Sequence, residues 1–144
     1  MKVEIKIHKD ITTAYAVIHT NELTTEITEA VEYLEKQNRF ITAESKGYIS
    51  ILNPNEIYMV RVENEKTIIY SEKDKYYSTK RLYQLEEMLG AGFMKISKSA
   101  VINLKKIDFV EPSFGGMMGI VLKNGCKDYI SRRYLPDFKK YLGV

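Results

Sequence analysis

Turn-forming residues divide the chain into short apolar segments from Asn53 onward, and this pattern limits the fold more than any other feature. Asn-Pro-Asn at 53–55 predicts a turn, and Asn124 followed by Gly125 is the pair most typical of a tight β-hairpin. The segments between the turns are rich in β-branched and aliphatic residues, which favour strands. We therefore expect this part of the chain to be mainly β.

Seven strands and two helices are expected here. The strands are predicted at residues 57–63, 67–71, 75–78, 93–96, 105–111, 119–123 and 127–131. Ser78 or Thr79 should begin a helix that ends at Gly90, and a second short helix should begin near Pro136. The apolar face of the first helix consists of Leu82, Leu85, Met88 and Leu89. That of the second consists of Phe138, Tyr141 and Leu142.

The first 44 residues follow a different pattern. Residues 2–8 alternate between polar and apolar side chains, which predicts a half-buried strand, and residues 14–20 predict a second strand that contains His19. Asn21 or Thr24 then caps a helix over 26–37. Its apolar residues at helical spacing are Ile27, Val31 and Leu34. Two further strands are expected at 40–44 and 48–52.

Charge separates the same two regions. Residues 1–44 contain five basic and eight acidic residues, whereas residues 45–144 contain 17 basic and 11 acidic ones. A basic region joined to an acidic one indicates a polyanion as a partner of the former. We place a domain boundary on this shift. Residues 1–44 would form an N-terminal α/β extension, a dimerisation or regulatory unit, and residues 45–144 a separate domain.

The composition excludes several classes of protein. The single cysteine, Cys126, cannot form an internal disulfide and fits a reducing compartment. No apolar run reaches the roughly 18 residues that span a bilayer, and the N-terminus lacks the apolar core of a signal peptide. We therefore expect a cytoplasmic protein without membrane insertion.

No catalytic constellation stands out. Neither His8 nor His19 has the spacing of a metal ligand, and no glycine-rich phosphate-binding loop is present in the sequence. Cys126 has no supporting context for nucleophilic catalysis. We expect no enzyme activity, no metal site and no cofactor.

Two basic segments are the strongest candidates for function. They are FMKISKSAVINLKKI at 93–107 and YISRRY at 129–134. In both, an apolar residue anchors the backbone, and Lys95, Lys98, Arg132 and Arg133 project from it. Positive charge held in this way can contact DNA in one register.

The segment FMKISKSAVINLKKIDFVEP resembles the signature of the LytTR DNA-binding domain. The matching residues are Phe93, Ser99, Val101, Ile102, Asn103, Leu104 and Ile107. IYMVRVENEKTIIY with KYYSTKRLYQLEEML is similar to the first hairpin and helix of that domain, and LKNGCKDYISRRYLPDFKKYL to its last hairpin and C-terminal end. The resemblance covers residues 48–144. The preceding segment is similar to the extension of stand-alone LytTR regulators that lack a receiver domain.

The resemblance implies an α+β, mainly β fold of small packed β-sheets with short helices, preceded by a small N-terminal α/β strand–helix extension. It also implies that loops, not a recognition helix, contact DNA in adjacent major grooves. Carried over by position, the contacts of the three family loops fall on Lys66, on Lys98 and its neighbours, and on Arg133. Three departures are visible. The positions of Lys66 and Lys98 carry lysine, which cannot read adenine through two amide hydrogen bonds, and Ala100 stands where the family frequently has an aromatic residue.

These positions receive separate roles. Arg133 can form a planar fork to guanine, so we expect it to read a base directly. Lys66 and Lys98 reach either a base edge or a phosphate. The residues expected to contact phosphates are Lys95, Ser97, Ser99 and Arg132. Asn103 lies on the inner side of the motif, and we expect it to hydrogen-bond backbone and shape the loop.

Three alternatives stay open. Arg132 and Arg133 could instead form surface ion pairs with Asp128 or Asp137. The chain could be a protein-interaction module that works through its N-terminal strand–helix unit, or a small enzyme or ligand sensor. The hypothesis we adopt is a transcription regulator of the LytTR type that binds double-stranded DNA sequence-specifically as a homodimer, with a regulatory protein as a further candidate partner.

Overall fold

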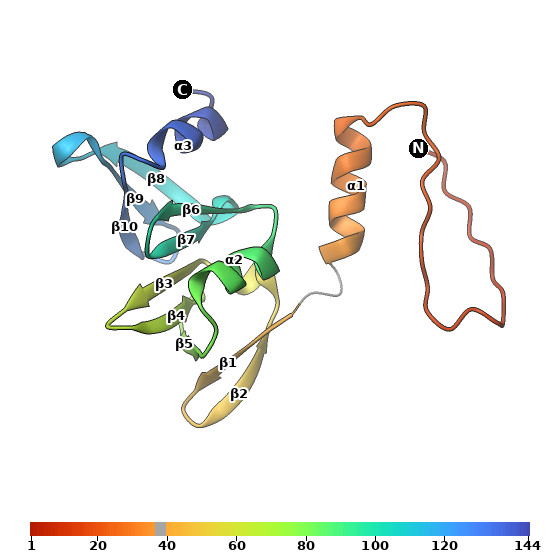
Figure 1. The fold of residues 1–144 in the computed structure, drawn as a ribbon, viewed down its shortest axis with the longest axis horizontal. Helices are drawn as coiled ribbons and strands as arrows, with labels where there is room; N and C mark the ends of the chain where they lie inside the picture. Colours follow the sequence, from red (N-terminus) through yellow and green to blue (C-terminus); the bar gives the residue numbers. More distant parts are fainter. Residues whose placement is uncertain (37–39) are drawn as a thin grey trace. The chain divides into compact units, whose positions relative to one another are not determined.

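The computed structural model describes residues 1–36 and 40–144, and the chain divides into two compact units, Met1–Glu35 and Lys36–Val144 (Figure 1). The first unit contains one regular element, helix α1 at Thr25–Lys36. Thr24 begins it, because its hydroxyl accepts a hydrogen bond from the Ile27 N–H at 3.3 Å. The cap predicted at Asn21 or Thr24 is therefore Thr24. Residue 37, at the predicted end of this helix, lies outside the described residues.

The strands predicted at 2–8 and 14–20 are wrong. Residues 1–24 contain no strand, and the side chains of Val3, Ile5 and Ile7 are 77–88% exposed. Alternation gives a segment one apolar face, but a strand also needs a neighbour for its N–H and C=O groups. The described part of the first unit provides none. His19, expected inside a strand, is exposed instead.

The second unit is built on a seven-stranded antiparallel sheet with the order β2-β1-β5-β4-β3-β7-β6. Its strands are β1 Ile41–Ser45, β2 Tyr48–Leu52, β3 Met59–Glu63, β4 Lys66–Tyr70, β5 Lys75–Ser78, β6 Phe93–Ser97 and β7 Ala100–Asn103. A three-stranded antiparallel sheet follows, with the order β10-β9-β8. Its strands are β8 Ile107–Pro112, β9 Met118–Leu122 and β10 Lys127–Ile130. The mainly β fold expected from the sequence is thereby confirmed.

Two α-helices and three short 3-10 helices complete this unit. Helix α2 spans Leu82–Leu89 and helix α3 spans Leu135–Leu142. The 3-10 turns lie at Pro54–Glu56, Leu104–Lys106 and Phe114–Gly116. Among the described residues, no helix has the length and apolar character needed to cross a membrane.

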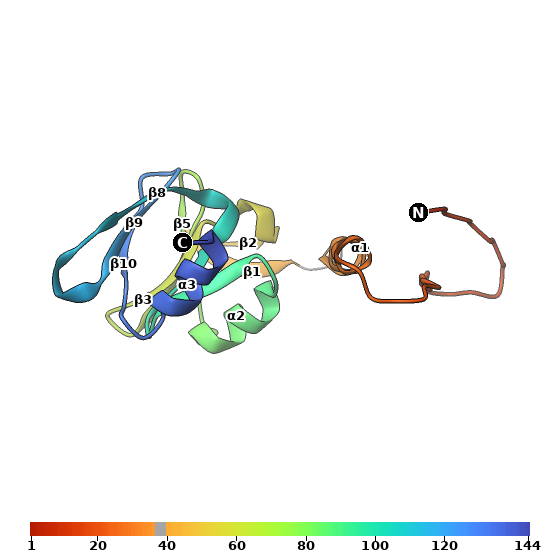
Figure 2. The ribbon, with the colours of Figure 1, turned by 90° about the horizontal axis from the view of Figure 1, so that it is seen from above.

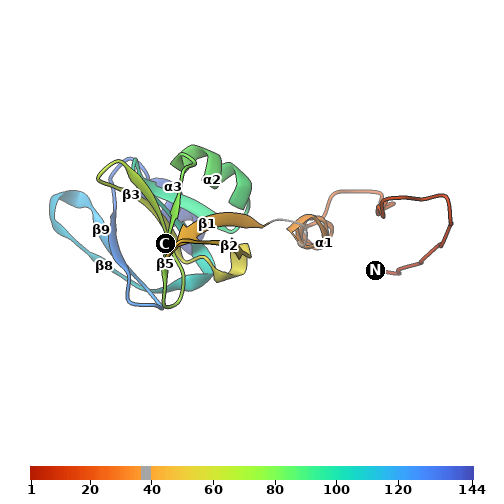
Figure 3. The same cartoon turned by 90° about the horizontal axis from the view of Figure 1, so that it is seen from below.

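The central strands of the seven-stranded sheet are covered on both faces, which explains their continuous apolar runs. Figures 2 and 3 show α2 and the β8–β9–β10 sheet on different sides of strands β3 to β5. Neighbouring residues of β3 point in opposite directions, so Met59 packs toward the small sheet and α3, whereas Val60 packs toward α2. Ile68 and Ile69 of β4 divide in the same way.

Four further expectations differ from the structure. Strand β7 was not predicted as a separate strand, because the turn before it contains no glycine, proline or asparagine. Helix α2 begins after Arg81, since the Ser78 hydroxyl accepts a hydrogen bond from the Lys80 N–H and closes a local turn instead. Tyr141 is 52% exposed, whereas Phe138 is buried as predicted. The boundary predicted after residue 44 falls inside β1, which pairs with both β2 and β5.

Candidate nucleic-acid interface

Three turns of the second unit are brought close together by hydrogen bonds between backbone groups. The Val62 N–H at the end of β3 donates to Ser99 O at 2.8 Å, which places the β6–β7 turn beside the β3–β4 hairpin. The Ser131 N–H donates to Ile96 O at 2.9 Å, which fixes the β10–α3 turn beside β6. The predicted site residues come from these three turns and from β6. The fold therefore gathers segments that are up to 67 residues apart, from Lys66 to Arg133.

The β6–β7 turn is tight and presents Lys98 at its tip. Ser97 closes the turn, because its Oγ accepts a hydrogen bond from the Ser99 N–H at 3.2 Å. The two hydroxyl oxygens lie 3.4 Å apart, and the pairing of β6 with β7 is irregular between Lys95 and Ser97. Ile96 is fully buried beneath the turn. Lys98 and Ser99 are consequently exposed on a backbone that is held from below.

A groove on this surface is lined by three of the predicted lysines, Lys66, Lys95 and Lys98. Lys66 is the first residue of β4 and pairs with Glu63 of β3 across the hairpin. The same groove is lined by Lys80 and Arg81, from the connection between β5 and α2. These two residues were not predicted, although the adjacent basic pair just before a helix was visible in the sequence.

Tyr134 links Lys95 to Arg133. The ammonium nitrogen of Lys95 lies 6.0 Å from the centroid of the tyrosine ring, and the guanidinium carbon of Arg133 lies 5.8 Å from it. Both cations are therefore within the range of attraction to the ring face. Arg133 itself is exposed. The aromatic ring thus orients the side chain expected to read a base without removing it from solvent.

Arg132 lies in the same β10–α3 turn as Arg133 but contacts a different loop. Its aliphatic stem packs close to Gly116 in the β8–β9 loop, since a Cβ atom at that glycine would be 3.2 Å from Arg132 Cδ. Within the described parts of the chain, neither Arg132 nor Arg133 forms the ion pair that was considered as an alternative. Asp128, one of the suggested partners, is paired with Arg61 instead.

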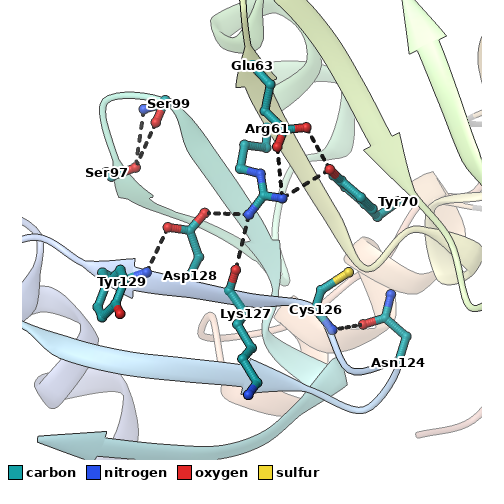
Figure 4. A network of polar contacts seen from close by, with 10 residues as sticks. All are labelled: Arg61, Glu63, Tyr70, Ser97, Ser99, Asn124, Cys126, Lys127, Asp128 and Tyr129. Atoms are coloured by element: carbon teal, nitrogen blue, oxygen red, sulfur yellow. Dashed lines mark hydrogen bonds and ion pairs between the residues drawn. The ribbon is translucent and has the colours of Figure 1, made fainter. Parts of the chain in front are cut away.

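Arg61 joins the two sheets beside this surface (Figure 4). Its guanidinium donates to the backbone oxygen of Lys127 at 3.1 Å and to the carboxylate of Asp128 at 3.3 Å, both on β10. It also donates to the hydroxyl of Tyr70 at 3.0 Å and pairs with Glu63 at 3.1 Å. The Tyr70 hydroxyl in turn donates to Glu63 at 2.7 Å. Sequence analysis missed this residue, because its partners lie on different strands.

The network changes the acid–base properties of its members. Burial is the largest single influence on the pKa of Arg61 and acts to lower it, but the hydrogen bonds to Tyr70 and Asp128 and the charge interactions with Tyr70 and Glu63 together raise the pKa. Burial, followed by the hydrogen bond to Glu63, raises the pKa of Tyr70. Nearby, burial raises the pKa of the Cys126 thiol, which disfavours the nucleophilic thiolate.

Asn103 has the structural role that the sequence predicted. It is buried, its amide nitrogen donates to Ile57 O at 2.9 Å, and its amide oxygen accepts from the Lys105 N–H at 3.0 Å. The side chain therefore joins the end of β7 to the segment before β3 and fixes the start of the 3-10 turn that follows β7.

Comparisons with known proteins agree with this description. The family model of the LytTr DNA-binding domain matches residues 47–143. The sensory transduction protein LytT of Enterococcus faecalis is 32% identical over 72% of this chain, and the chain spans 43% of that protein's length. An uncharacterized HTH-type transcriptional regulator of Staphylococcus aureus (strain NCTC 8325) is 31% identical, with 100% of this chain and 99% of that protein covered.

A solved structure of a LytTr DNA-binding domain from Bacillus cereus has the same fold. It superimposes with a TM-score of 0.69 at 18% sequence identity, over 74% of this chain and 99% of that one. The ordered motifs, the paired sheets and the matched residues lead to one assignment. The chain belongs to the LytTR DNA-binding domain family.

Proposed function

We propose that this protein is a transcription regulator that binds duplex DNA sequence-specifically through the three neighbouring turns of its second unit. One observation carries the proposal: basic side chains from these turns lie close together on one surface. Buried residues hold the backbone of these turns in place. Helices α2 and α3 are separated by five strands, so the described part of the second unit offers no pair of consecutive helices for a helix-turn-helix. The exposed turns carry the cations, and we propose that these turns enter the major groove.

Each side chain on this surface has a proposed role. Arg133 reads a guanine edge, because its planar fork is exposed and oriented by Tyr134. Lys98, at the tip of its turn, and Lys66 contact a base edge or a phosphate. Phosphate contacts that fix the register are assigned to Lys95, Ser97, Ser99 and Arg132. Family membership supports the site as a whole, and the geometry supports this division of roles.

We also propose that the protein acts in the cytoplasm and that it does so as a homodimer; features of the first unit support the homodimer. Val3, Ile5 and Ile7 are exposed on an alternating segment, and α1 leaves Leu34 48% exposed. Apolar side chains in such number favour an interaction surface. A second copy would also suit binding to a repeated DNA site. The alternative partner of this unit is a regulatory protein.

A selection experiment tests the DNA-binding function. The full chain is used to enrich duplexes from a random pool, and fluorescence anisotropy then compares an enriched duplex with a random one. We expect a preference of at least about 1,000-fold, together with affinity that falls steeply as salt increases. If no sequence is enriched, or if the selected and random duplexes bind equally weakly, the result contradicts sequence-specific binding and favours the interaction module.

The same assay tests the role of Arg133. Arg133→Ala should weaken the enriched duplex by about 1–3 kcal/mol through loss of the guanine contact, and should weaken the random duplex much less. Lys123→Ala provides the control, because Lys123 is exposed in the β9–β10 turn, at the opposite end of β10. Equal losses of affinity on both duplexes would contradict base reading and indicate that Arg133 contacts a phosphate.

A further inference from the structure

The connection between β5 and α2 carries two cations, Lys80 and Arg81, that were not among the predicted site residues. Lys80 and Arg81 line the same groove as Lys66, Lys95 and Lys98. They come from a segment that lies 13 residues or more from each of these lysines in sequence. The fold thus adds a fourth segment to the surface formed by the three turns.

Hydrogen bonds fix the backbone of this connection, although the connection is neither a helix nor a strand. The Lys80 N–H donates to Ser78 Oγ at 3.1 Å, and the Arg81 N–H donates to Gln84 Oε1 at 2.9 Å. Arg81 O accepts from the N–H groups of Gln84 and Leu85 at 3.1 and 3.2 Å. The backbone donors of both cations are therefore satisfied internally, and only their side chains are available to a ligand.

The charge of the groove is not balanced by the chain itself. Five cationic side chains line it, and Glu65 supplies the one carboxylate among its lining residues. None of the five cations takes part in an ion pair within the described residues. Repulsion among cations held near one another is relieved when a polyanion lies between them.

The groove also matches a phosphate backbone in its other lining groups. Tyr77 and Tyr83 line it and are 47% and 61% exposed, and a tyrosine hydroxyl can donate to a phosphate oxygen. The cations of the lining come from separate segments, namely the β3–β4 hairpin, the β5–α2 connection, and β6 with the turn that follows it. An extended chain of phosphates fits this arrangement better than a single compact ligand.

We infer that the groove between the β5–α2 connection and the β6–β7 turn holds the sugar–phosphate backbone of duplex DNA, and that Lys80 and Arg81 contact two phosphates there. The inference rests on the proposed function and extends it, because these phosphates lie beside those contacted by the three turns. The contacts carry no sequence information. They add affinity and salt dependence, and they fix the protein's orientation on the duplex.

The experiment measures how the affinity depends on salt. The variant Lys80→Gln/Arg81→Gln is compared with the wild type on an enriched and on a random duplex, by fluorescence anisotropy at several salt concentrations. Removing two phosphate contacts should reduce the slope of log K against log salt by about 1.8. The loss of affinity should be the same factor on both duplexes.

Two control variants make the result specific. Lys73→Gln/Lys123→Gln removes the same charge from exposed turns away from the groove, since Lys73 lies in the β4–β5 turn, at the other end of β4 from Lys66. This variant should keep the wild-type slope. The exchange Lys80→Arg/Arg81→Lys retains both charges and should also keep it; a reduced slope there would show a structural effect and overturn the inference.

The outcomes separate this inference from the proposed function. If the wild type prefers an enriched duplex but Lys80→Gln/Arg81→Gln keeps the same salt slope, only the two proposed phosphate contacts are overturned. A loss confined to the enriched duplex also overturns them, because it would indicate base reading. A wild type that binds neither duplex overturns the proposed function and this inference with it.

Discussion

Arg61 is the single side chain that contributes most to holding β3 and β10 together. It contacts a carboxylate and a backbone oxygen on β10 and a carboxylate on its own strand. Because β10 leads directly into Arg132 and Arg133, the same contacts also position the end of the strand that carries them. The Nε atom of Arg61 is buried without a hydrogen-bond partner within the described residues, a cost that the remaining contacts offset.

Replacing Arg61 should destabilise the fold. Arg61→Met keeps much of the apolar stem but leaves Asp128, Glu63 and the Tyr70 hydroxyl without their cation. Hydrogen bonds to charged groups contribute about 1.5–3 kcal/mol each, so we expect the free energy of unfolding to fall by about 2 kcal/mol, after discounting for partial exposure. Urea denaturation measures it, with Arg81→Met as the control at an exposed arginine. Equal stability of the two variants would contradict the role assigned to the network.

At the residue scale, local chemistry was predictable and distant partners were not. The role of Asn103 followed from its short amide side chain on the inner side of the motif, and the structure confirms it. Arg61 could not be found in this way, because Asp128 lies 67 residues further along the chain. Lys80 and Arg81 were visible as a basic pair, but only the fold shows that they line the groove with Lys66.

At the element scale, the β9–β10 hairpin follows directly from its sequence. Asn124 Oδ1 accepts from the Cys126 N–H at 3.0 Å, and the Gly125 N–H donates to Leu122 O at 2.9 Å. Gly125 has φ +87°, a backbone conformation that side chains disfavour. The turn signal and the observed hairpin agree because these two hydrogen bonds, which close the turn, are local; Asn124 also donates to Ser71 O at 2.8 Å.

Gly125→Ala should therefore weaken the small sheet through the backbone alone. No atom lies within 4 Å of the added Cβ, so a steric clash does not contribute. We expect a loss of about 1 kcal/mol in the free energy of unfolding, measured by urea denaturation. Lys123→Ala in the same turn is the control and should change it by less than about 0.5 kcal/mol. An unchanged stability in Gly125→Ala would show that the turn accommodates a side chain at this φ.

The incorrect elements share one cause. The predicted strand at 2–8 has the right alternation but no neighbouring strand in the described part of its unit. Conversely, β7 was missed because no glycine, proline or asparagine separates it from β6, although Val101 and Ile102 are fully buried between β3 and β6. In both cases the prediction relied on periodicity along one segment, which contains no information about where the chain turns or which strand lies alongside.

At the scale of the whole molecule, the two units divide the proposed work. All the candidate DNA contacts lie in Lys36–Val144, whereas the exposed alternating segment and α1 lie in Met1–Glu35. The charge shift in the sequence indicated this division, although the compact second unit begins at Lys36, ahead of the predicted boundary. The hairpin of β1 and β2 belongs to the large sheet because β1 pairs with β5.

Removing Met1–Glu35 should therefore abolish self-association without preventing the second unit from folding. The remaining chain keeps both sheets and both core clusters, so its thermal midpoint should stay close to that of the full protein. Sedimentation velocity should show that the full protein forms a dimer and that the shortened one is a monomer. A matched full-length variant, Val3→Ser/Ile5→Ser/Ile7→Ser, tests whether the exposed apolar side chains are responsible, because it removes them without shortening the chain. A shortened protein that still dimerises would move the interface to the second unit, where β2 is an edge strand of the large sheet with Ile49 and Ile51 exposed.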